Sequence, residues 1–458
     1  MMIINREELV SGNRSYERNI VLDLLEEGVR ASDSYKNVKR ILKIEEGNIV
    51  VNGDFKVPLG DIERIIVVGA GKASARMALG IEEILEDKIE YDGIIIAPKN
   101  IKTKLKRIRI LEGDHPTPSL RNVENTMEII KLLKSRGDKD LVIVLISGGG
   151  SSLLTIPEEG LKIEDIIEIT NLLLKCGANI YEINAVRKHI CGVKGGKLFA
   201  RYIYPSKAIT LIVSDVIGDN IEVIASGPTA LNTTTPKQAK EVLKKYGLWD
   251  TAPNRIKKYL DDLIVKGGWR FNEEIFNKVK NIVIANNLQS LIAMKEIALK
   301  IGYNTIIISS KIQGEAREAG KIIGGILLEA LTSGHPVKSP AVIIAGGETT
   351  VTVKGSGKGG RNQELALSTA KIIDGNSRIV FASMGSDGID GNTDVAGAIV
   401  DDETMSVARG MGLNEDEYLN NNDTYNFFRK IGNSLIITGV TETNVNDFMI
   451  GVIRERNH

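Results

Sequence analysis

Short apolar runs rich in β-branched residues alternate with longer amphipathic segments along most of this chain. An apolar run bounded by turn residues is typical of a buried strand, and apolar residues recurring every three or four positions are typical of a helix. The runs predicted to form strands are Ile65–Gly69, Gly93–Ala97, Leu141–Ile146, Ala208–Ser214, Asn281–Ala285, Thr305–Ser309, Ala341–Ala345, Arg378–Ser383 and Ser434–Thr438. The segments predicted to form helices are Ala73–Glu86, Val123–Ser135, Ile163–Lys175, Pro236–Tyr246, Leu288–Lys300, Gly314–Leu331 and Gln363–Ile373. This alternation predicts an α/β fold with a largely parallel sheet whose faces are covered by helices.

The chain has 458 residues, which exceeds what one hydrophobic core usually supports, so two domains are expected. The polar stretch Trp249–Asn277 is the predicted junction, and we place the expected domains at residues 1–275 and 276–458. Ligands of parallel sheets lie beyond the carboxyl ends of strands. The loops that directly follow predicted strands therefore carry the candidate chemistry.

The composition shows no strong electrostatic bias. Hydrophobic residues make up 42% of the chain and charged residues 26%, with 59 basic and 59 acidic side chains. This balance argues against nucleic acid or a membrane surface as a partner, and the apolar runs are too short to span a bilayer. Cys176 and Cys191 form no CxxC pair, and the histidines are too scattered for a zinc set. We expect a cytoplasmic enzyme that acts on a small molecule.

The loop with the sequence GSGKGGRNQE, at 355–364, runs into a predicted helix. Glycines let backbone amides approach an anion closely, and Lys358 and Arg361 would add positive charge at the helix start. The alternative is a surface loop with solvated cations. The residues of this loop predicted to bind phosphate are Gly357, Lys358, Gly359 and Gly360.

The turn GAGKAS, at 69–74, links a predicted strand to a predicted helix. It fails the phosphate-loop motif because Lys72 is followed by Ala73. It meets the dinucleotide fingerprint only in part, because Ser74 replaces the third glycine. We predict phosphate contacts from Gly69 and Gly71, and the alternative is a structural turn with an exposed lysine.

A third glycine-rich loop, SGGGSS, directly follows the predicted strand Leu141–Ile146. Its amides and hydroxyls could hold a carboxylate or a phosphate. A serine-hydrolase elbow needs GxSxG, and Leu145 stands where its first glycine belongs, so nucleophilic serine chemistry is discounted. A tight turn without a ligand is the alternative. The predicted substrate-binding residues of this loop are Ser147, Gly148, Gly149, Gly150, Ser151 and Ser152.

Acidic residues follow two further predicted strands. Asp215 and Asp219 lie in SDVIGD, and Asp387 lies in GSDGIDGNTD. Mg²⁺ takes one or two carboxylates together with substrate phosphate oxygens, so Asp215 and Asp387 are the candidate metal ligands. The same residues could instead cap helices or form Asx turns. The spacing of a calcium-binding EF-hand loop is absent.

Cationic and imidazole side chains complete the candidate chemistry. His115, in GDHPTP, either contacts substrate or is a packed structural histidine. Arg187, in NAVRKH, and Lys194, in VKGGK, either attract an acidic substrate or are simply solvated. We predict Arg187 as a substrate contact and Lys194 as a phosphate contact.

Taken in order, these strings resemble the class II glycerate 2-kinases, whose carboxy-terminal part is called the MOFRL domain. The resemblance spans most of the chain, although Glu442 stands where that family usually has glycine. The strings that carry it are GAGKAS at 69–74, GDHPTP at 113–118, SGGGSS at 147–152, NAVRKH at 184–189, VKGGK at 193–197, SDVIGD at 214–219, SGPT at 226–229, GGET at 346–349, GGRNQE at 359–364 and GSDGIDGNTD at 385–394.

The resemblance implies a Rossmann-like amino-terminal domain and a smaller α/β MOFRL domain, with D-glycerate and Mg·ATP meeting in the cleft between them. The implied reaction gives ADP and 2-phosphoglycerate, and the residues matching Lys72 and Arg361 are implied to be catalytic. Phosphoryl transfer depends on positioning and charge neutralisation, so these cations would clamp the γ-phosphoryl group. We further expect Ser147 to Ser152 to hold the glycerate carboxylate or hydroxyls, and Asp215 to position the metal or the attacking 2-hydroxyl.

Two other functions remain open at this point. An NAD(P)H-dependent hydroxypyruvate reductase would act on a related substrate through the glycine turn at 69–74, although the incomplete fingerprint argues against it. A non-enzymatic sensor of a phosphorylated sugar acid is the other. The sequence does not decide the oligomeric state, and a homodimer is compatible with it.

Overall fold

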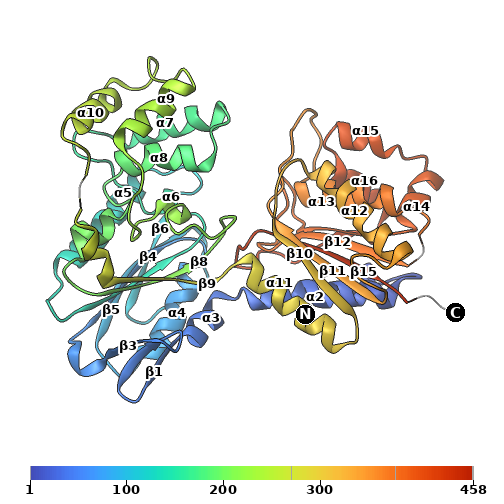
Figure 1. Ribbon diagram of the computed structural model, residues 1–458, viewed down its shortest axis with the longest axis horizontal. Helices are drawn as coiled ribbons and strands as arrows, with labels where there is room; N and C mark the ends of the chain where they lie inside the picture. Colours follow the sequence, from blue (N-terminus) through green and yellow to red (C-terminus); the bar gives the residue numbers. More distant parts are fainter. Residues whose placement is uncertain (1, 270, 377, 456–458) are drawn as a thin grey trace. The chain divides into compact units, whose positions relative to one another are not determined.

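Two six-stranded β-sheets organise the chain in the computed structural model, which describes residues 2–269, 271–376 and 378–455 (Figure 1). They belong to two units, one formed by Ser34–Ile284 and the other by Met1–Asp33 together with Ala285–His458. The predicted α/β fold class is confirmed. The division differs from the expected domains because residues 1–33 belong with the carboxy-terminal part, and that part begins at Ala285.

The sheet of the Ser34–Ile284 unit has the strand order β6-β5-β4-β7-β8-β9. Parallel pairing runs from β6 through β5, β4 and β7 to β8. β4 and β7 are buried at every position, as expected for central strands covered on both faces, which explains their continuous apolar sequences. The strands of this sheet are β4 (Ile65–Ala70), β5 (Tyr91–Pro98), β6 (Ile108–Gly113), β7 (Leu141–Ile146), β8 (Ala208–Val213) and β9 (Val279–Ala285). A small antiparallel sheet consists of β1 (Leu42–Glu45), β2 (Asn48–Val51) and β3 (Phe55–Pro58).

Helices pack against both faces of the parallel sheet and also form a cluster of their own. Val68 and Ile94 on the sheet pack with Ile129 of α5 in one core, while Ile166 of α7 and Leu243 of α9 belong to a separate helical core. α9 begins where the Thr235 hydroxyl accepts the amide of Gln238, a capping contact that its sequence predicts. The helices are α3 (Ser34–Ile41), α4 (Ser74–Leu85), α5 (Leu120–Lys134), α6 (Gly150–Leu153), α7 (Ile163–Lys175), α8 (Ile180–Ile190), α9 (Pro236–Lys245) and α10 (Asn254–Val265).

The sheet of the other unit has the strand order β10-β11-β15-β12-β13-β14 and is mostly antiparallel. Only the pair β10 and β11 is parallel among its described ladders, and β15 lies between β11 and β12, antiparallel to both. The strands are β10 (Asn304–Ile312), β11 (Ala341–Gly347), β12 (Ile379–Gly385), β13 (Gly397–Asp401), β14 (Leu435–Ile436) and β15 (Asp447–Ile453). The helices are α1 (Arg6–Leu9), α2 (Ser15–Ala31), α11 (Asn287–Lys300), α12 (Ala316–Ser333), α13 (Arg361–Ile373), α14 (Thr404–Gly410), α15 (Glu415–Asn420) and α16 (Thr424–Ile431).

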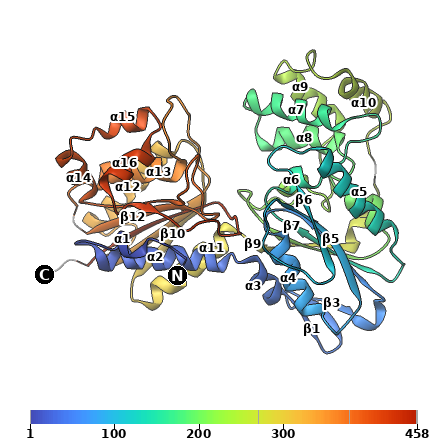
Figure 2. The same ribbon diagram turned by 180° about the vertical axis from the view of Figure 1, so that it is seen from behind.

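The amino-terminal helix α2 explains why residues 1–33 belong to this unit. It packs against α11 and against β15 and β12, as Figures 1 and 2 show from opposite sides. Arg18 forms a buried ion pair with Asp401 at 2.6 Å, and Arg14 pairs with Asp402 at 2.8 Å. A local sequence pattern gives no sign of partners that lie this far along the chain.

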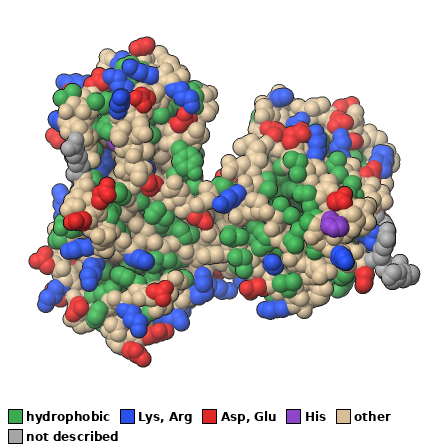
Figure 3. Space-filling model, viewed as in Figure 1, with side chains coloured by type: hydrophobic (Ala, Val, Ile, Leu, Met, Phe, Trp, Pro, Cys, Tyr) green, Lys and Arg blue, Asp and Glu red, His purple; other side chains and the backbone are tan. Residues whose placement is uncertain are grey.

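The surface carries charges of both signs. Figure 3 shows basic and acidic side chains interspersed over the visible face of each unit, in agreement with the equal totals in the sequence. Within the described ranges, none of the helices combines the length and the apolar character that crossing a bilayer requires.

Candidate functional site

The loops that follow β4 and β7 lie against each other in the Ser34–Ile284 unit. The amide of Lys72 donates to the carbonyl of Gly148 at 2.8 Å, and the amide of Ala73 donates to the hydroxyl of Ser147 at 3.0 Å. The amide of Ser147 donates in return to the carbonyl of Ala70 at 3.3 Å. Parallel neighbours end at the same edge of a sheet, so these bonds join the two predicted loops into one structure.

Glycine is required where these loops approach other groups closely. A Cβ atom on Gly71, whose φ is +142°, would lie 2.1 Å from the hydroxyl oxygen of Ser147. A Cβ atom on Gly149, whose φ is +84°, would lie 2.9 Å from Cδ2 of His115. The backbone conformation disfavours a side chain at both positions, and at Gly71 the backbone of Ser147 also leaves no space for one.

The amides of the turn at 71–74 are already bonded within the chain. Besides the two bonds described above, the amide of Gly71 donates to the carbonyl of Ile96 at 3.1 Å, and the amide of Ser74 donates to the carbonyl of Gly71 at 3.3 Å. A phosphate could contact these amides only by displacing their acceptors. Packing also explains Gly69, because a Cβ there would lie 2.1 Å from the carbonyl oxygen of Leu145. Phosphate contacts from Gly69 and Gly71 stay a prediction.

Asp215 and His115 lie at the same edge of the sheet. Asp215 follows β8, and its Oδ2 atom would lie 2.4 Å from a Cβ atom on Gly148. His115 follows β6, and desolvation, with a smaller effect of the Lys72 ammonium, lowers the pKa of its imidazole. Within the described ranges, the Lys72 ammonium has no carboxylate partner. The carboxyl ends of β4, β6, β7 and β8 thus combine an ammonium, an imidazole, a carboxylate and several hydroxyls.

A chain of polar side chains supports the loop after β7. The hydroxyls of Ser151 and Ser226 are 3.0 Å apart, and Ser226 donates to Oδ1 of Asn184 at 2.8 Å. Ala225 and Ser226 have φ angles of 50° and 61°, an uncommon left-handed backbone for residues other than glycine. Ser226 and Asn184 are site residues that the sequence reasoning did not single out. They lie in the strings SGPT and NAVRKH, which could have indicated them.

Arg187 and Lys194 lie behind this loop. Arg187 is partly buried on α8, and its Nε donates to the Thr170 hydroxyl at 3.4 Å. Lys194 is buried, and its ammonium donates to the carbonyl of Leu154, directly after α6, at 2.7 Å. Neither side chain is a solvated surface cation, which was the alternative interpretation of the sequence.

The glycine-rich loop at 355–364 lies in the other unit, and its amides are also bonded within the chain. The amides of residues 354 to 359 donate to oxygens of residues 421 to 423 and of Asn392 at 2.7 to 3.1 Å. A Cβ atom on Gly357 would lie 2.4 Å from Cβ of Asp423, and one on Gly360 would lie 2.3 Å from Cγ of Asp390. These glycines are explained by close packing. Phosphate binding by Gly357, Lys358, Gly359 and Gly360 stays a prediction.

The side chain of Lys358 faces the ring of Tyr425. Its ammonium lies 3.9 Å from the ring centroid, a cation–π contact, and 3.5 Å from the carboxylate of Asp394. Because this side chain is 41% exposed, a ligand could still reach the ammonium from solvent.

Arg361 begins α13 and is held by two carboxylates. Its Nε and one terminal nitrogen donate to the two oxygens of Asp447 at 2.7 and 3.0 Å, and the other terminal nitrogen donates to Glu348 at 2.9 Å. Burial is the largest single cause and lowers the pKa of the Arg361 guanidinium, but the charge and the hydrogen bonds of Asp447, together with the charge of Glu348, outweigh it and raise that pKa. The side chain of Arg361 is 33% exposed, so a pre-oriented cation still faces solvent.

Asp390 organises the start of α13. Its two carboxylate oxygens accept both the amide and the side-chain nitrogen of Asn362 and of Gln363, at 2.9 to 3.2 Å. This buried carboxylate at a helix start holds the segment that carries Arg361. The predicted metal ligand Asp387 instead accepts the amide of Ile389 at 3.2 Å, the Asx-turn alternative of the sequence analysis. Its role as a metal ligand stays a prediction.

Among the described residues, no group of three or more His, Cys, Asp and Glu side chains is arranged to hold a metal ion. An ion that arrives with a nucleotide needs fewer protein ligands, since phosphate oxygens supply the others. Asp215, beside the loop after β7, fits that requirement.

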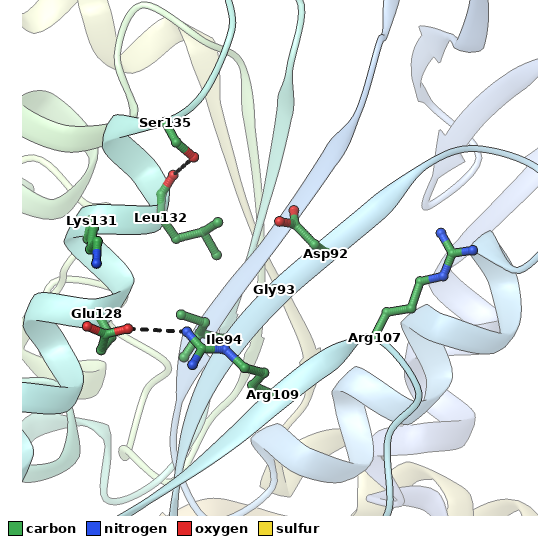
Figure 4. A pocket seen from close by; sticks show the side chains of 9 residues that line it. All are labelled: Asp92, Gly93, Ile94, Arg107, Arg109, Glu128, Lys131, Leu132 and Ser135. Atoms are coloured by element: carbon green, nitrogen blue, oxygen red, sulfur yellow. Dashed lines mark hydrogen bonds and ion pairs between the residues drawn. The ribbon is translucent and has the colours of Figure 1, made fainter.

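A cavity of about 360 Å³ lies at the opposite end of the parallel sheet, toward the amino ends of β5 and β6. Figure 4 shows its side chains, with Arg109 of β6 paired to Glu128 of α5. None of the predicted site residues lines this cavity. Its lining residues are Asp92, Gly93, Ile94, Arg107, Arg109, Glu128, Lys131, Leu132 and Ser135.

Two family models match the chain in the order of its units. A model described as a domain of unknown function, DUF4147, matches residues 20–261, and the MOFRL family model matches residues 341–447. With the fold and the loops described above, they define a two-unit α/β protein with a MOFRL domain.

The chain is 40% identical to the glycerate 2-kinase of Pyrococcus horikoshii over 96% of its own length and 98% of that protein. It is 41% identical to the D-glycerate 2-kinase of Thermotoga maritima, over 87% of this chain and 92% of that one. A crystal structure of glycerate kinase from Thermotoga maritima superposes with a TM-score of 0.84 at 37% identity, covering 95% and 99% of the two chains. The chain therefore belongs to the MOFRL-type glycerate kinase family. A protein of Agrobacterium vitis whose name refers to hydroxypyruvate reductase is 40% identical over 84% of this chain and 98% of its own length.

Proposed function

We propose that this chain transfers the γ-phosphoryl group of ATP to the 2-hydroxyl of D-glycerate, giving ADP and 2-phosphoglycerate, in a cytoplasmic setting. One observation carries the proposal. The carboxyl ends of four strands bring Lys72, which has no carboxylate partner among the described residues, beside the hydroxyl-rich loop after β7 and the carboxylate of Asp215. Membership in the glycerate kinase family supports the same reaction.

The loop after β7 is the proposed glycerate site. The hydroxyl of Ser147 accepts the amide of Ala73, so its own proton remains available for donation to a substrate oxygen. The hydroxyls of Ser151 and Ser152 lie on the short helix α6 that follows. Together they can hold the two hydroxyls of glycerate in a fixed orientation, with Arg187 as a further substrate contact.

Lys72 acts on the phosphoryl group in this proposal. Transfer forms a bond between the 2-hydroxyl oxygen and the γ-phosphorus and breaks the bond between that phosphorus and the oxygen that leaves with ADP. A fixed ammonium stabilises the charge on the phosphoryl oxygens during this step.

Asp215 is proposed to hold Mg²⁺ or to orient the attacking hydroxyl. The ion is part of the substrate, because Mg²⁺ accompanies ATP and takes most of its ligands from phosphate and water. A carboxylate that lies directly against the glycerate loop suits either task.

Arg361 is proposed to approach the same phosphoryl group from the other unit, so that the active site is the cleft between the units. Asp447 and Glu348 fix the guanidinium through three donors, and two of its five N–H groups remain for phosphate. Asp447 and Glu348 fix the orientation of the guanidinium, but they also neutralise part of its positive charge. Phosphate binding by the amides of residues 357 to 359 would require them to give up their hydrogen bonds to Asn421, Asp423 and Asn392.

The test is an assay of ADP formation from ATP, Mg²⁺ and D-glycerate, followed by NMR identification of the phosphorylated carbon. Lys72→Ala and Arg361→Ala should each lower kcat/KM by about 10²- to 10³-fold, because each removes a charge that stabilises the transferring group. Exposed, ion-paired Lys39 and Arg409 provide matched controls, whose alanine variants should retain full activity. Retention of near-normal transfer by both site variants would refute the clamp.

Lys72→Arg separates placement from charge. Arginine keeps the positive charge but changes its shape and donor geometry. Near-normal turnover of this variant would indicate a general electrostatic role, and a loss close to that of Lys72→Ala would indicate exact placement.

A hydroxypyruvate reductase is the second candidate, favoured by the names of two Agrobacterium vitis relatives. A dinucleotide pyrophosphate normally uses free amides of the first glycine turn. Here those amides are bonded to Ile96, Ser147 and Gly148. Oxidation of NADH with hydroxypyruvate, without consumption of ATP, would select the reductase instead.

A further inference from the structure

Four cations lie on or just after the carboxy-terminal half of α8, and carboxylates among the described residues neutralise two of them. Lys188 pairs with Glu222 at 3.0 Å, and Lys197 pairs with Glu158 at 2.6 Å. Both lysine side chains are almost completely buried, at 4% and 2% exposure. Pairing of this kind is the usual condition for placing a charge inside a protein.

Arg187 and Lys194 lack such a partner among the described residues. Arg187 has only a long contact with the Thr170 hydroxyl, at 3.4 Å, and Lys194 has the carbonyl of Leu154, at 2.7 Å. Burial is the main cause that lowers the pKa of both groups, and no carboxylate opposes it. A lysine can respond by losing its proton, whereas arginine stays charged in proteins. Arg187 is therefore a cation that the fold leaves uncompensated.

This uncompensated charge adjoins the proposed glycerate loop. Asn184 lies three residues before Arg187, so both side chains lie on the same face of α8. Asn184 accepts the hydroxyl of Ser226, which contacts Ser151 of the loop. On the other side, Lys194 donates to the carbonyl of Leu154, the residue directly after α6. The two cations thus flank the segment that carries the serines.

We propose that Arg187, with Lys194 behind it, binds the carboxylate of the substrate and makes the enzyme selective for a free hydroxy acid over a neutral polyol, ester or amide. This inference rests on the proposed function and refines it, because it leaves the serines of the loop for the substrate hydroxyls. It also moves Lys194 from the nucleotide to the acid substrate. Arg187 would form paired charge-assisted hydrogen bonds with both carboxylate oxygens, and Lys194 would position α6 through its hydrogen bond to the carbonyl of Leu154.

The kinetic test compares D-glycerate with D-glyceramide, its uncharged counterpart, in the wild type and in Arg187→Gln. Loss of two charge-assisted hydrogen bonds should raise the KM for D-glycerate on the order of 100-fold. The KM for ATP should stay within about twofold, and the preference for glycerate over glyceramide should largely disappear. Arg187→Lys keeps the charge without the paired geometry and should lie between the two.

A stability measurement separates this role from a structural one. An uncompensated charge that is partly buried does not stabilise the free protein, so Arg187→Gln should melt at the same temperature as the wild type or higher in the absence of ligand. Lys197→Gln is the matched control. It breaks a buried pair with Glu158 and should lower the Tm by several degrees.

Three results would overturn the inference. They are an unchanged KM for D-glycerate in Arg187→Gln, an increase confined to the KM for ATP, and a lower Tm or loss of folding in the same variant. An increase confined to ATP would assign the cations to nucleotide phosphate. Calorimetric titration with D-glycerate alone keeps the inference distinct from the proposed function. If the wild type binds glycerate and Arg187→Gln does not, the carboxylate site stands even when no phosphoryl transfer is detected.

Discussion

Burial of His189 should make the Ser34–Ile284 unit sensitive to acid. This side chain is 2% exposed, its Nε2 lies 3.3 Å from the Thr234 hydroxyl, and its Nδ1 is buried without a hydrogen-bond partner in the described structure. Burial is the largest cause, with Lys197 and Lys188 adding to it, and together they lower the pKa of the imidazole to about 3. The fold therefore needs the neutral ring.

The sign and size of the effect follow from this shift. The ordinary pKa of histidine is about 6.5, so between about pH 3 and pH 6.5 the unfolded chain binds a proton at position 189 that the folded chain does not. The free energy of unfolding then falls as the pH drops through this window, by up to about 1.4 kcal/mol per pH unit. At pH 5 the loss attributable to His189 should be about 2 kcal/mol relative to pH 7.5.

Tryptophan fluorescence during urea denaturation provides the assay, because both tryptophans of the chain, Trp249 and Trp269, lie in this unit. Between pH 7.5 and pH 5 the free energy of unfolding should fall by about 2 kcal/mol more in the wild type than in His189→Gln. This difference does not depend on how stable the variant is at pH 7.5. The same substitution at exposed His335, in the other unit, is the control and should leave the transition unchanged. Equal pH dependence in the wild type and His189→Gln would refute the reasoning.

Two further substitutions test the loops of the site. Gly149→Ala and Gly160→Ala impose the same strained backbone, since both glycines have a φ of +84°, but only Gly149 faces another group, the ring of His115. We expect Gly160→Ala to lower the free energy of unfolding in urea by about 1 kcal/mol without changing turnover. Gly149→Ala should in addition lower kcat/KM at least tenfold. Equal turnover of the two variants would show that the contact between Gly149 and His115 is dispensable. Asp215→Asn should raise the Mg²⁺ concentration that gives half-maximal activity, whereas Asp387→Asn should not, because Asp387 is used in a local turn. Titration of Mg²⁺ at saturating ATP measures the half-maximal Mg²⁺ concentration of both variants. If Asp387→Asn raises it and Asp215→Asn does not, the ion is assigned to Asp387.

The sequence predicted best the bounds of those elements whose own residues show a clear apolar pattern. β7 was predicted with its exact bounds and α7 likewise, because an uninterrupted apolar run and a regular helical repeat need no knowledge of distant partners. β15 and α2 were missed. The position of β15 in the sheet depends on its pairing with β11 and β12, which lie far away in the chain, and its own sequence does not reveal these partners.

The residues of the candidate site also differ in how far the sequence could predict their positions. Loops that follow strands could be located, so Lys72, Ser147 and Asp215 were correctly expected at one edge of the sheet. The partners of Arg361 could not be predicted, because Asp447 is 86 positions away and lies in no recognised string. For the same reason the sequence did not reveal that Gly357, Gly359 and Gly360 pack closely against Asp423, Thr424 and Asp390, and their role in phosphate binding stays a prediction.

The position of β15 has a consequence for synthesis on the ribosome. β11 and β12 are each complete once about residue 385 has emerged, yet neither pairs with the other, and the strand that joins them follows more than sixty residues later. Until then the nascent chain exposes two unsatisfied strand edges, which favour association with other chains. Asp447, which orients Arg361, is the first residue of that joining strand. A partly translated chain would therefore be both prone to aggregate and unable to align its arginine, and chaperone capture during translation should be strongest in this interval.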